Sequence, residues 1–138
     1  MADASTLCRR CGLCCDGNLF ASVPLAAEEV APLRAQGLVI VGQALRQRCA
    51  GLGEAGCGVY AQRPGRCREY RCMLLIALGD GEVDLDAALA VVDEAHARLA
   101  AVGPGPGSAL ARARRGEGPE ARAVVGFVAR HFERSVGA

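Results

Sequence analysis

The sequence predicts a mainly α fold with little β, in which an irregular cysteine-rich metal-binding lobe at residues 1–78 packs with a C-terminal set of helices at residues 84–138. Two observations indicate this fold class. All eight cysteines fall within the first 72 residues, and the residues after them carry apolar side chains at helical spacing. A chain of 138 residues with 51% hydrophobic and 22% charged residues has the size and composition of one globular domain. We therefore expect a single domain over residues 1–138.

Two helices are expected within residues 1–78, and the first is the longer. Leu25–Gln36 predicts this helix, with Glu28 and Glu29 in its early turns, where acidic side chains suit the helix dipole. Pro32 removes one helical hydrogen bond. The helix is therefore expected to begin late or to bend at the proline.

A hairpin, a loop and a short helix follow along the chain. Residues 38–48 predict a short hairpin around Gly42. The glycine-rich residues 51–56 predict a loop. Residues 73–78 are apolar throughout and predict a buried helix of one or two turns, which residues 79–81 end.

Three helices are predicted in the C-terminal region. Asp84 caps a long helix that continues to about Val102, and the Gly-Pro repeat at 103–107 ends it. Ser108 caps a short helix, and Pro119 lies in the first turn of the last helix. The apolar residues expected to face the core are Leu85, Leu89, Val92 and Leu99 in the long helix, and Ala121, Val124, Val125, Val128 and Phe132 in the last.

Charge and residue type exclude several classes of function. The 16 basic residues are all arginine and stand against 15 acidic residues, which gives a net charge of +1. Proteins that bind nucleic acid or membrane surfaces through bulk charge are usually far more basic. Neither a membrane nor nucleic acid is therefore expected as a partner. The absence of lysine excludes Schiff-base chemistry by a lysine side chain.

The cysteines are expected to work in the cytoplasm. The first residues contain no apolar run typical of a signal peptide, and no stretch of about 18 apolar residues is present to span a membrane. Thiols stay reduced in the cytoplasm, so eight cysteines there indicate metal or redox chemistry rather than disulfides. A disulfide framework, after export by an unrecognised route, is the alternative.

Four cysteines lie in one short segment, Cys8-Arg-Arg-Cys11-Gly-Leu-Cys14-Cys15. Two overlapping C-x-x-C pairs predict a tight loop in which three sulfurs point into one concavity. A C-x2-C-x2-C run is typical of bacterial iron–sulfur loops, where a distant cysteine completes the cluster. Zinc sites more often use two separated pairs. We therefore expect an iron–sulfur cluster, with the 4Fe–4S form favoured, or Zn²⁺.

The other cysteines leave the number of metal centres open. Cys14 and Cys15 are adjacent, so they ligate different centres, bridge two metals or leave one thiol spare, and a strained vicinal disulfide is a further option. The four remaining thiols have spacings unlike those of common zinc fingers: Cys49, Cys57, Cys67 and Cys72. The eight thiols suit two four-cysteine sites, or one such site with four other thiols.

Arginines accompany the cysteines along the chain. Nearby cations lower thiol pKa values and stabilise a negatively charged thiolate centre. Ordinary solvated charges are one alternative. A local phosphate or nucleic-acid patch is another, although aromatic stacking partners are few. The arginines in question are Arg9, Arg10, Arg46, Arg48, Arg63, Arg66, Arg68 and Arg71.

Two motifs together resemble one known family. The opening Cys8-x2-Cys11-Gly12-x-Cys14-Cys15 and the later Cys57-x2-Tyr60-x2-Arg63-Pro64-x2-Cys67-Arg68-x-Tyr70 are similar to the signature of the CxxCxxCC cysteine-cluster family of zinc- or iron-chelating domains. Cys49 and Cys72 fit the family's remaining cysteines. The resemblance covers residues 8–72. It implies that all eight cysteines chelate metal: Cys8, Cys11, Cys14, Cys15, Cys49, Cys57, Cys67 and Cys72.

Three motif residues are expected beside the centre rather than as ligands. Arg63 precedes a proline and therefore fixes an extended entry into a turn. Tyr60 offers an apolar ring with a hydrogen-bonding tip. Arg68 offers a planar fork of N–H donors to sulfur, carbonyl or carboxylate groups.

Three classes of function remain open, of which the third is a zinc-type module that binds nucleic acid through the arginines near the cysteines. The first is a metal-binding protein with a structural or redox-accessory centre, whose helical tail contacts a protein partner. The second is a metal-dependent enzyme, because the resemblance extends to the larger flagellin lysine N-methylases, although no glycine-rich cofactor loop follows a strand here. His96 and His131 lie far in sequence from the thiols and are expected on helix surfaces.

Overall fold

The computed structural model describes residues 2–53, 56–58 and 63–133 of the chain. Within these residues the fold is mainly α with little β, as predicted, since seven helices accompany five short strands. The described chain divides into two compact units. One contains Gly12–Tyr70, and the other contains the residues up to Cys11 together with those from Arg71 onward.

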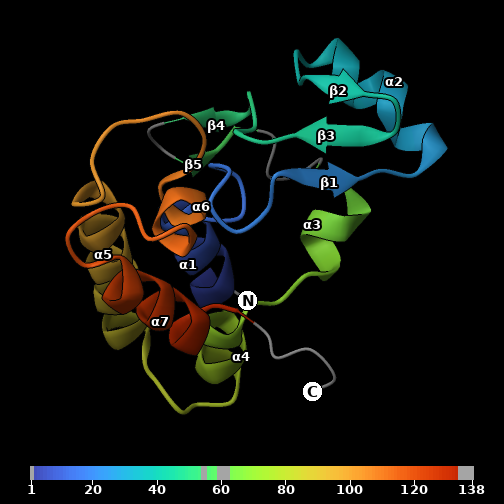
Figure 1. Ribbon diagram of the computed structural model, residues 1–138. Helices are drawn as coiled ribbons and strands as arrows, with labels where there is room; N and C mark the ends of the chain where they lie inside the picture. Colours follow the sequence, from blue (N-terminus) through green and yellow to red (C-terminus); the bar gives the residue numbers. More distant parts are fainter. Residues whose placement is uncertain (1, 54–55, 59–62, 134–138) are drawn as a thin grey trace. The chain divides into compact units, whose positions relative to one another are not determined.

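The second of these, the helical unit, is built around one long helix. Helix α5 packs against four other helices, and Figure 1 shows α7 and α6 beside it. The first helix of the chain, which the sequence analysis did not predict, belongs to this unit. The helices are α1 (Ala2–Cys11), α4 (Met73–Gly79), α5 (Leu85–Ala100), α6 (Ala109–Arg114) and α7 (Ala121–His131).

The core of the helical unit follows the predicted apolar stripes, except that α5 buries partly different residues from those expected. Of the residues expected in the core at the last helix, four are buried, Ala121, Val124, Val128 and Phe132, whereas Val125 is half-buried. In α5 the fully buried residues are Ala88, Val92, Ala95 and Leu99, whereas the larger Leu85 and Leu89 are half-buried. Alanines on the inner face allow neighbouring helices to approach closely. Each fully buried Val, Leu or Phe contributes about 1.5–3 kcal/mol relative to exposure.

Two of these helices begin with the side-chain caps that were predicted. Asp84 accepts a 2.8 Å hydrogen bond from the Ala87 N–H at the start of α5, and Ser108 accepts one of 3.1 Å from the Ala111 N–H at the start of α6. Such caps satisfy backbone donors that the first turn leaves without a helical partner. None of the described helices has the length and apolarity needed to cross a lipid bilayer.

The other unit, the cysteine unit (residues 12–70), contains a small antiparallel sheet. Strand β3 (Ala44–Arg46) lies between β1 (Ser22–Pro24) and β2 (Ile40–Val41). The predicted hairpin around Gly42 is confirmed by β2 and β3, and Gly42 turns the chain with φ +63°. Strand β1 was not predicted, because three residues give too short a pattern.

One face of this sheet carries the apolar core of the cysteine unit. Helix α2 (Ala27–Ala35) confirms the predicted helix and contains Pro32 within it. Leu33 of α2 and Leu45 of β3 are both buried in this core. Glu29 accepts hydrogen bonds from the N–H of Ala26 at 2.9 Å and from that of Gly65 at 2.7 Å, so it joins α2 to the next helix.

The predicted loop at residues 51–56 is wrong in part. Strand β4 (Leu52–Gly53) pairs with β5 (Gly56–Cys57) in an antiparallel two-stranded ladder. The glycine-rich composition did not indicate this pairing, because the pairing is formed by backbone hydrogen bonds and not by side chains. Helix α3 (Gly65–Glu69) follows and was not predicted either.

Candidate metal centre

Cys8 and Cys11 lie in helix α1, so the prediction of a tight loop is wrong for these two residues. Arg9 and Arg10 in the last turn suit the negative end of the helix dipole, and Leu7 is fully buried. Both features stabilise a helix where the sequence analysis considered only cysteine spacing. A separation of three residues in a helix places the Cys8 and Cys11 side chains on one face.

A glycine ends α1 and leads into the next two cysteines. Gly12 has φ +68°, the left-handed conformation that favours glycine after a helix. Its carbonyl oxygen accepts hydrogen bonds of 2.9 Å from the N–H groups of Cys15 and Asp16. Cys14 and Cys15 therefore lie in a tight turn, as the sequence analysis expected for this end of the motif.

Two backbone carbonyls of this turn are bound by a distant segment of the cysteine unit. The side-chain amide of Gln47 donates a 2.7 Å hydrogen bond to the Cys14 carbonyl oxygen. The N–H of Cys49 donates another of 2.7 Å to the Cys15 carbonyl oxygen. Together they hold the main chain of Cys49 beside the Cys14–Cys15 turn. No sequence pattern pointed to Gln47, because an amide bound to a backbone carbonyl depends on the tertiary fold.

Three cysteines of this unit share one apolar core. Cys49 is buried within the core, and Cys15 and Cys67 pack against it. The sulfur of Cys49 accepts a hydrogen bond of 3.4 Å from the Gly51 N–H. Backbone N–H groups that point at sulfur favour its thiolate form. The fold thus brings these three cysteines from separate parts of the sequence to one apolar core.

Cys72 begins a helix of the helical unit. Its sulfur accepts a 3.4 Å hydrogen bond from the Leu75 N–H and so caps α4. Burial raises the pKa of the Cys72 thiol, and backbone N–H groups, that of Leu75 foremost, partly oppose this rise. Helix α4 packs against α1, the helix that carries Cys8 and Cys11.

The second motif is described only in part. The backbone of Cys57 pairs with Leu52 at the end of β5, but its side chain lies outside the described residues, as do the side chain of Arg68 and the whole of Tyr60. Arg63 is half-buried. The proline after it has φ −54° and ψ 153° and directly precedes α3.

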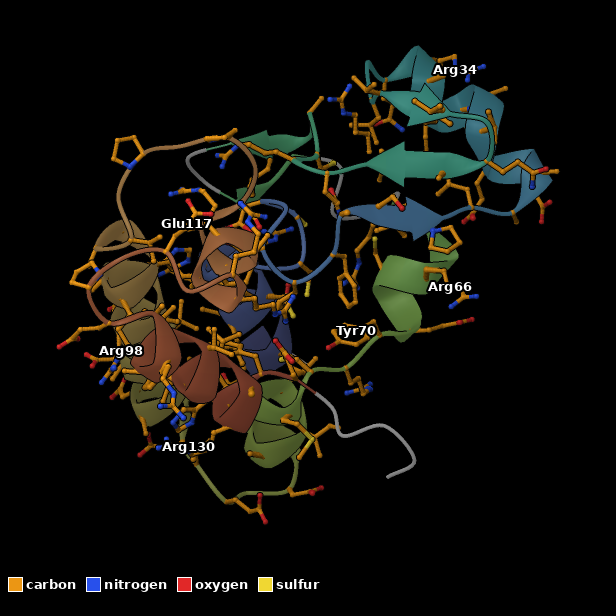
Figure 2. All side chains as sticks on the ribbon, viewed as in Figure 1. Arg34, Arg66, Tyr70, Arg98, Glu117 and Arg130 are labelled. Carbon is orange, nitrogen blue, oxygen red and sulfur yellow. The ribbon has the colours of Figure 1, made fainter. Side chains whose placement is uncertain are left out.

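The last residue of the second motif contacts the segment that follows the first. Tyr70 comes directly after α3 (Figure 2). Its ring meets that of Phe20 edge to face, with ring centroids 5.0 Å apart. Such a pair contributes about 0.5–1.5 kcal/mol beyond its buried area. Tyr70 of the second motif therefore has a packing role, against Phe20.

The two histidines have different surroundings. The Nε2 atom of His96 lies 2.6 Å from the carbonyl oxygen of Cys11, which sequence spacing did not reveal. The ring of His131 lies 4.5 Å from that of Phe127. Burial lowers the pKa of His131, and the positive charges of Arg130 and Arg98 lower it further. His131 therefore favours its neutral form.

The chemistry of the donor set suits a soft metal. Thiolates are the preferred ligands of zinc and of iron–sulfur clusters, and none of the seven cysteines whose side chains are described is in a disulfide. Within the described part of the chain, however, no three Cys, His, Asp or Glu side chains are gathered closely enough to hold a metal ion.

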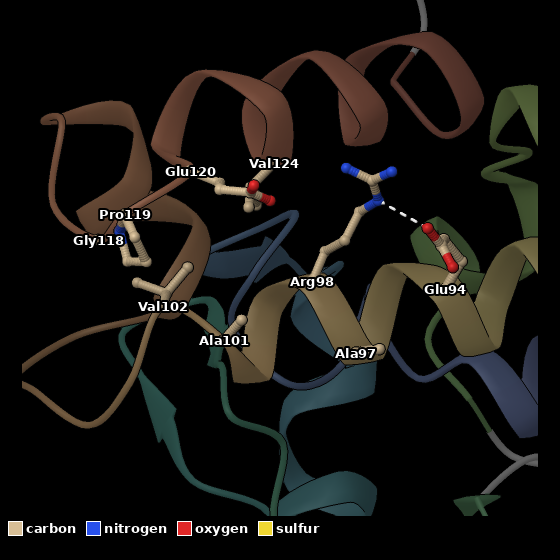
Figure 3. Close-up of a pocket in the computed structure, with 9 residues that line it drawn as sticks. All are labelled: Glu94, Ala97, Arg98, Ala101, Val102, Gly118, Pro119, Glu120 and Val124. Carbon is tan, nitrogen blue, oxygen red and sulfur yellow. Dashed lines mark hydrogen bonds and ion pairs between the residues drawn. The ribbon is translucent and has the colours of Figure 1, made fainter.

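A pocket in the helical unit offers a different kind of surface. It has a volume of about 340 Å³ between α5 and the start of α7, and its lining is mostly apolar (Figure 3). Glu94 and Arg98 form an ion pair of 3.0 Å at its edge, and the Arg98 guanidinium lies 4.7 Å above the Phe127 ring. The residues that line it include no cysteine or histidine, so it is separate from the candidate ligands.

Comparison with known proteins gives one match. A family model, CxxCxxCC, described as "Putative zinc- or iron-chelating domain", matches residues 7–94, which is more than half of the chain. The match begins in α1 and ends within α5, beyond the residues that carry the two motifs. The searches of curated proteins and of solved structures give no match.

Proposed function

Because this chain belongs to the CxxCxxCC family of zinc- or iron-chelating domains, we propose that it binds zinc or iron through its cysteine thiolates. The observation that carries the proposal is the pair of hydrogen bonds from Gln47 and Cys49 to the Cys14 and Cys15 carbonyls. These bonds hold a downstream cysteine beside the first motif. The proposed ligands are Cys8, Cys11, Cys14, Cys15, Cys49, Cys57, Cys67 and Cys72.

Electrostatics supports thiolate ligation. A centre with four thiolates around a divalent ion carries about two negative charges, which need nearby donors or cations. The sulfurs of Cys49 and Cys72 already accept backbone N–H groups, and such bonds stabilise the thiolate. The arginines near the cysteines in sequence add positive charge. Arg63 and Arg68 are proposed to stabilise the centre in this way, and Tyr60 to pack beside it.

For the iron form, a 4Fe–4S cluster is proposed. The C-x2-C-x2-C run offers three of the four thiolates that such a cluster takes, and any later cysteine offers the fourth. For the zinc form, four thiolates close a tetrahedral structural site. When bound, either group supplies a rigid link between segments that are distant in sequence, and the cluster additionally supplies a redox couple.

A structural or redox-accessory role in the cytoplasm follows from this donor set. Reduced thiols are available in that compartment, and a site closed by protein sulfurs has no open position for substrate. The C-terminal helices are then the surface for a protein partner. This role is distinguishable from catalysis by the number of protein sulfurs on each metal.

The test is metal analysis of the full chain purified without oxygen. A broad visible absorption band, with about four irons and four sulfides per chain, supports the cluster. A colourless protein with bound zinc supports the zinc form. Protein that contains neither metal, and that takes up neither Zn²⁺ nor Fe²⁺ with sulfide after reduction, would refute the proposal.

A further inference from the structure

The last carbonyl of α1, the helix that carries Cys8 and Cys11, accepts a hydrogen bond from a residue of another helix. Cys11 is the last residue of α1, and the last carbonyls of a helix lack partners within it. His96 of α5 places its Nε2 atom 2.6 Å from the Cys11 carbonyl oxygen. A carbonyl only accepts hydrogen bonds, so Nε2 carries the proton and donates.

This bond is a directional contact between α1 and α5. The two helices pack against each other, and Arg10 and Asp93 form an ion pair of 3.3 Å between them. Both members of that pair are more than half exposed, and exposed pairs contribute little to stability. The His96 bond is exposed too, but it reaches the main chain of a candidate ligand.

We propose that His96 is a positioning residue for the metal-binding cysteines of α1, an inference that rests on the proposed function. The last turn of a helix frays easily, because its carbonyls have no helical partners. By holding the Cys11 carbonyl, His96 keeps this turn helical. Cys8 and Cys11 then stay on one face of α1, so less order has to be imposed when metal binds.

His96 lies outside the part of the chain that the family model matches, because the match ends at residue 94. The helix that supplies His96 continues through the family boundary without a break. The C-terminal region of this chain therefore contributes directly to the backbone of the cysteine motif.

The test is Zn²⁺ affinity of the full chain, measured by competition with a chromophoric chelator. His96→Ala is expected to bind Zn²⁺ about tenfold more weakly, as for other groups that orient metal ligands. His96→Gln, which keeps an N–H donor, is expected to restore most of the affinity. His131→Ala is the matched control, since it removes the other histidine from a site with a different contact. Asp93→Asn controls for loosened helix packing.

Each outcome decides between the possibilities. Weak binding by His96→Ala alone, with rescue by His96→Gln, supports the positioning role. Unchanged affinity in His96→Ala overturns it, while the proposed function stands. An equal loss of affinity in His96→Gln overturns it as well, because the imidazole itself would then be required. An equal loss in Asp93→Asn also overturns it, because looser helix packing would then explain the weaker binding. If the unmodified chain binds no metal, the proposed function fails instead.

Discussion

The backbone N–H of Cys49 donates a 2.7 Å hydrogen bond to the carbonyl oxygen of Cys15. A bond between main-chain groups therefore holds these two cysteines near each other. A substitution at either side chain leaves this bond in place. Thiol variants at these positions thus report on metal binding with little disturbance of the backbone.

Cys49→Ser is expected to release most of the bound metal from the proposed centre. A serine oxygen still accepts the Gly51 N–H that the sulfur accepts now, but a hydroxyl is a poor ligand for zinc or iron. The metal-free protein is expected to lose only about 1 kcal/mol of stability. Metal analysis, with urea unfolding in the presence of a chelator, measures both effects.

Ala50→Ser is the control for this change. It adds a hydroxyl to the next residue, which is exposed, and is expected to keep the metal. Full metal content in Cys49→Ser would remove Cys49 from the ligand set.

Gln47→Ala is expected to destabilise the cysteine unit. It removes the 2.7 Å hydrogen bond to the Cys14 carbonyl oxygen, and loss of a partly buried bond costs about 1 kcal/mol. The matched variant is Gln43→Ala. Gln43 is exposed, and its amide makes a longer, part-buried bond of 3.4 Å to the Leu25 carbonyl oxygen. Urea unfolding should show a clear loss for the first variant and almost none for the second. Equal effects would show that the Gln47 bond has no special role.

The helices of the C-terminal region could be predicted because their signals are local. Asp84 and Ser108 precede apolar stripes and cap α5 and α6, as the residue types suggested. The hairpin around Gly42 could be predicted for the same reason. In each case the residues that decide the structure lie within a few positions of one another.

The arrangement around the cysteines could not be predicted, because it depends on long-range contacts. The spacing of Cys8 and Cys11 suits a loop as well as a helix, and packing of α1 on α5 selects the helix. The bonds of Gln47 and His96 to the carbonyls of Cys14 and Cys11 join residues 33 and 85 positions apart. Sequence spacing therefore identified candidate ligands but not the groups that hold their backbone.

Gly12→Ala is expected to destabilise the end of α1. Gly12 has φ +68°, where a side chain costs about 1–2 kcal/mol. An added Cβ would meet the Leu52 side chain at 3.5 Å, an ordinary contact, so the cost is conformational rather than steric. Gly79→Ala is the control, because Gly79 lies at the end of α4 with nothing near its Cβ position. That variant is expected to gain about 0.5–1 kcal/mol. Thermal unfolding of both variants with a chelator present checks the contrast.

Cys72 is expected to make the metal-free protein sensitive to alkaline pH. Burial raises the pKa of this thiol in the folded state above its usual 9.0, so the folded chain holds the proton more tightly than the unfolded chain. The resulting stability is fully present below pH 9.0 and is lost as the pH rises through the folded-state pKa. Urea unfolding with a chelator, at neutral pH and at increasing alkaline pH, measures this loss.

Two substitutions separate the cap of Cys72 from its titration. Cys72→Ser keeps an acceptor for the Leu75 N–H, and serine is a strong helix cap, so neutral-pH stability should be kept while this part of the alkaline loss disappears. Cys72→Ala removes the cap and should cost about 1 kcal/mol at neutral pH. If Cys72→Ser retained the full alkaline loss, the titrating group would be another thiol. If Cys72→Ala were as stable as the unmodified chain, the sulfur would contribute nothing as a cap.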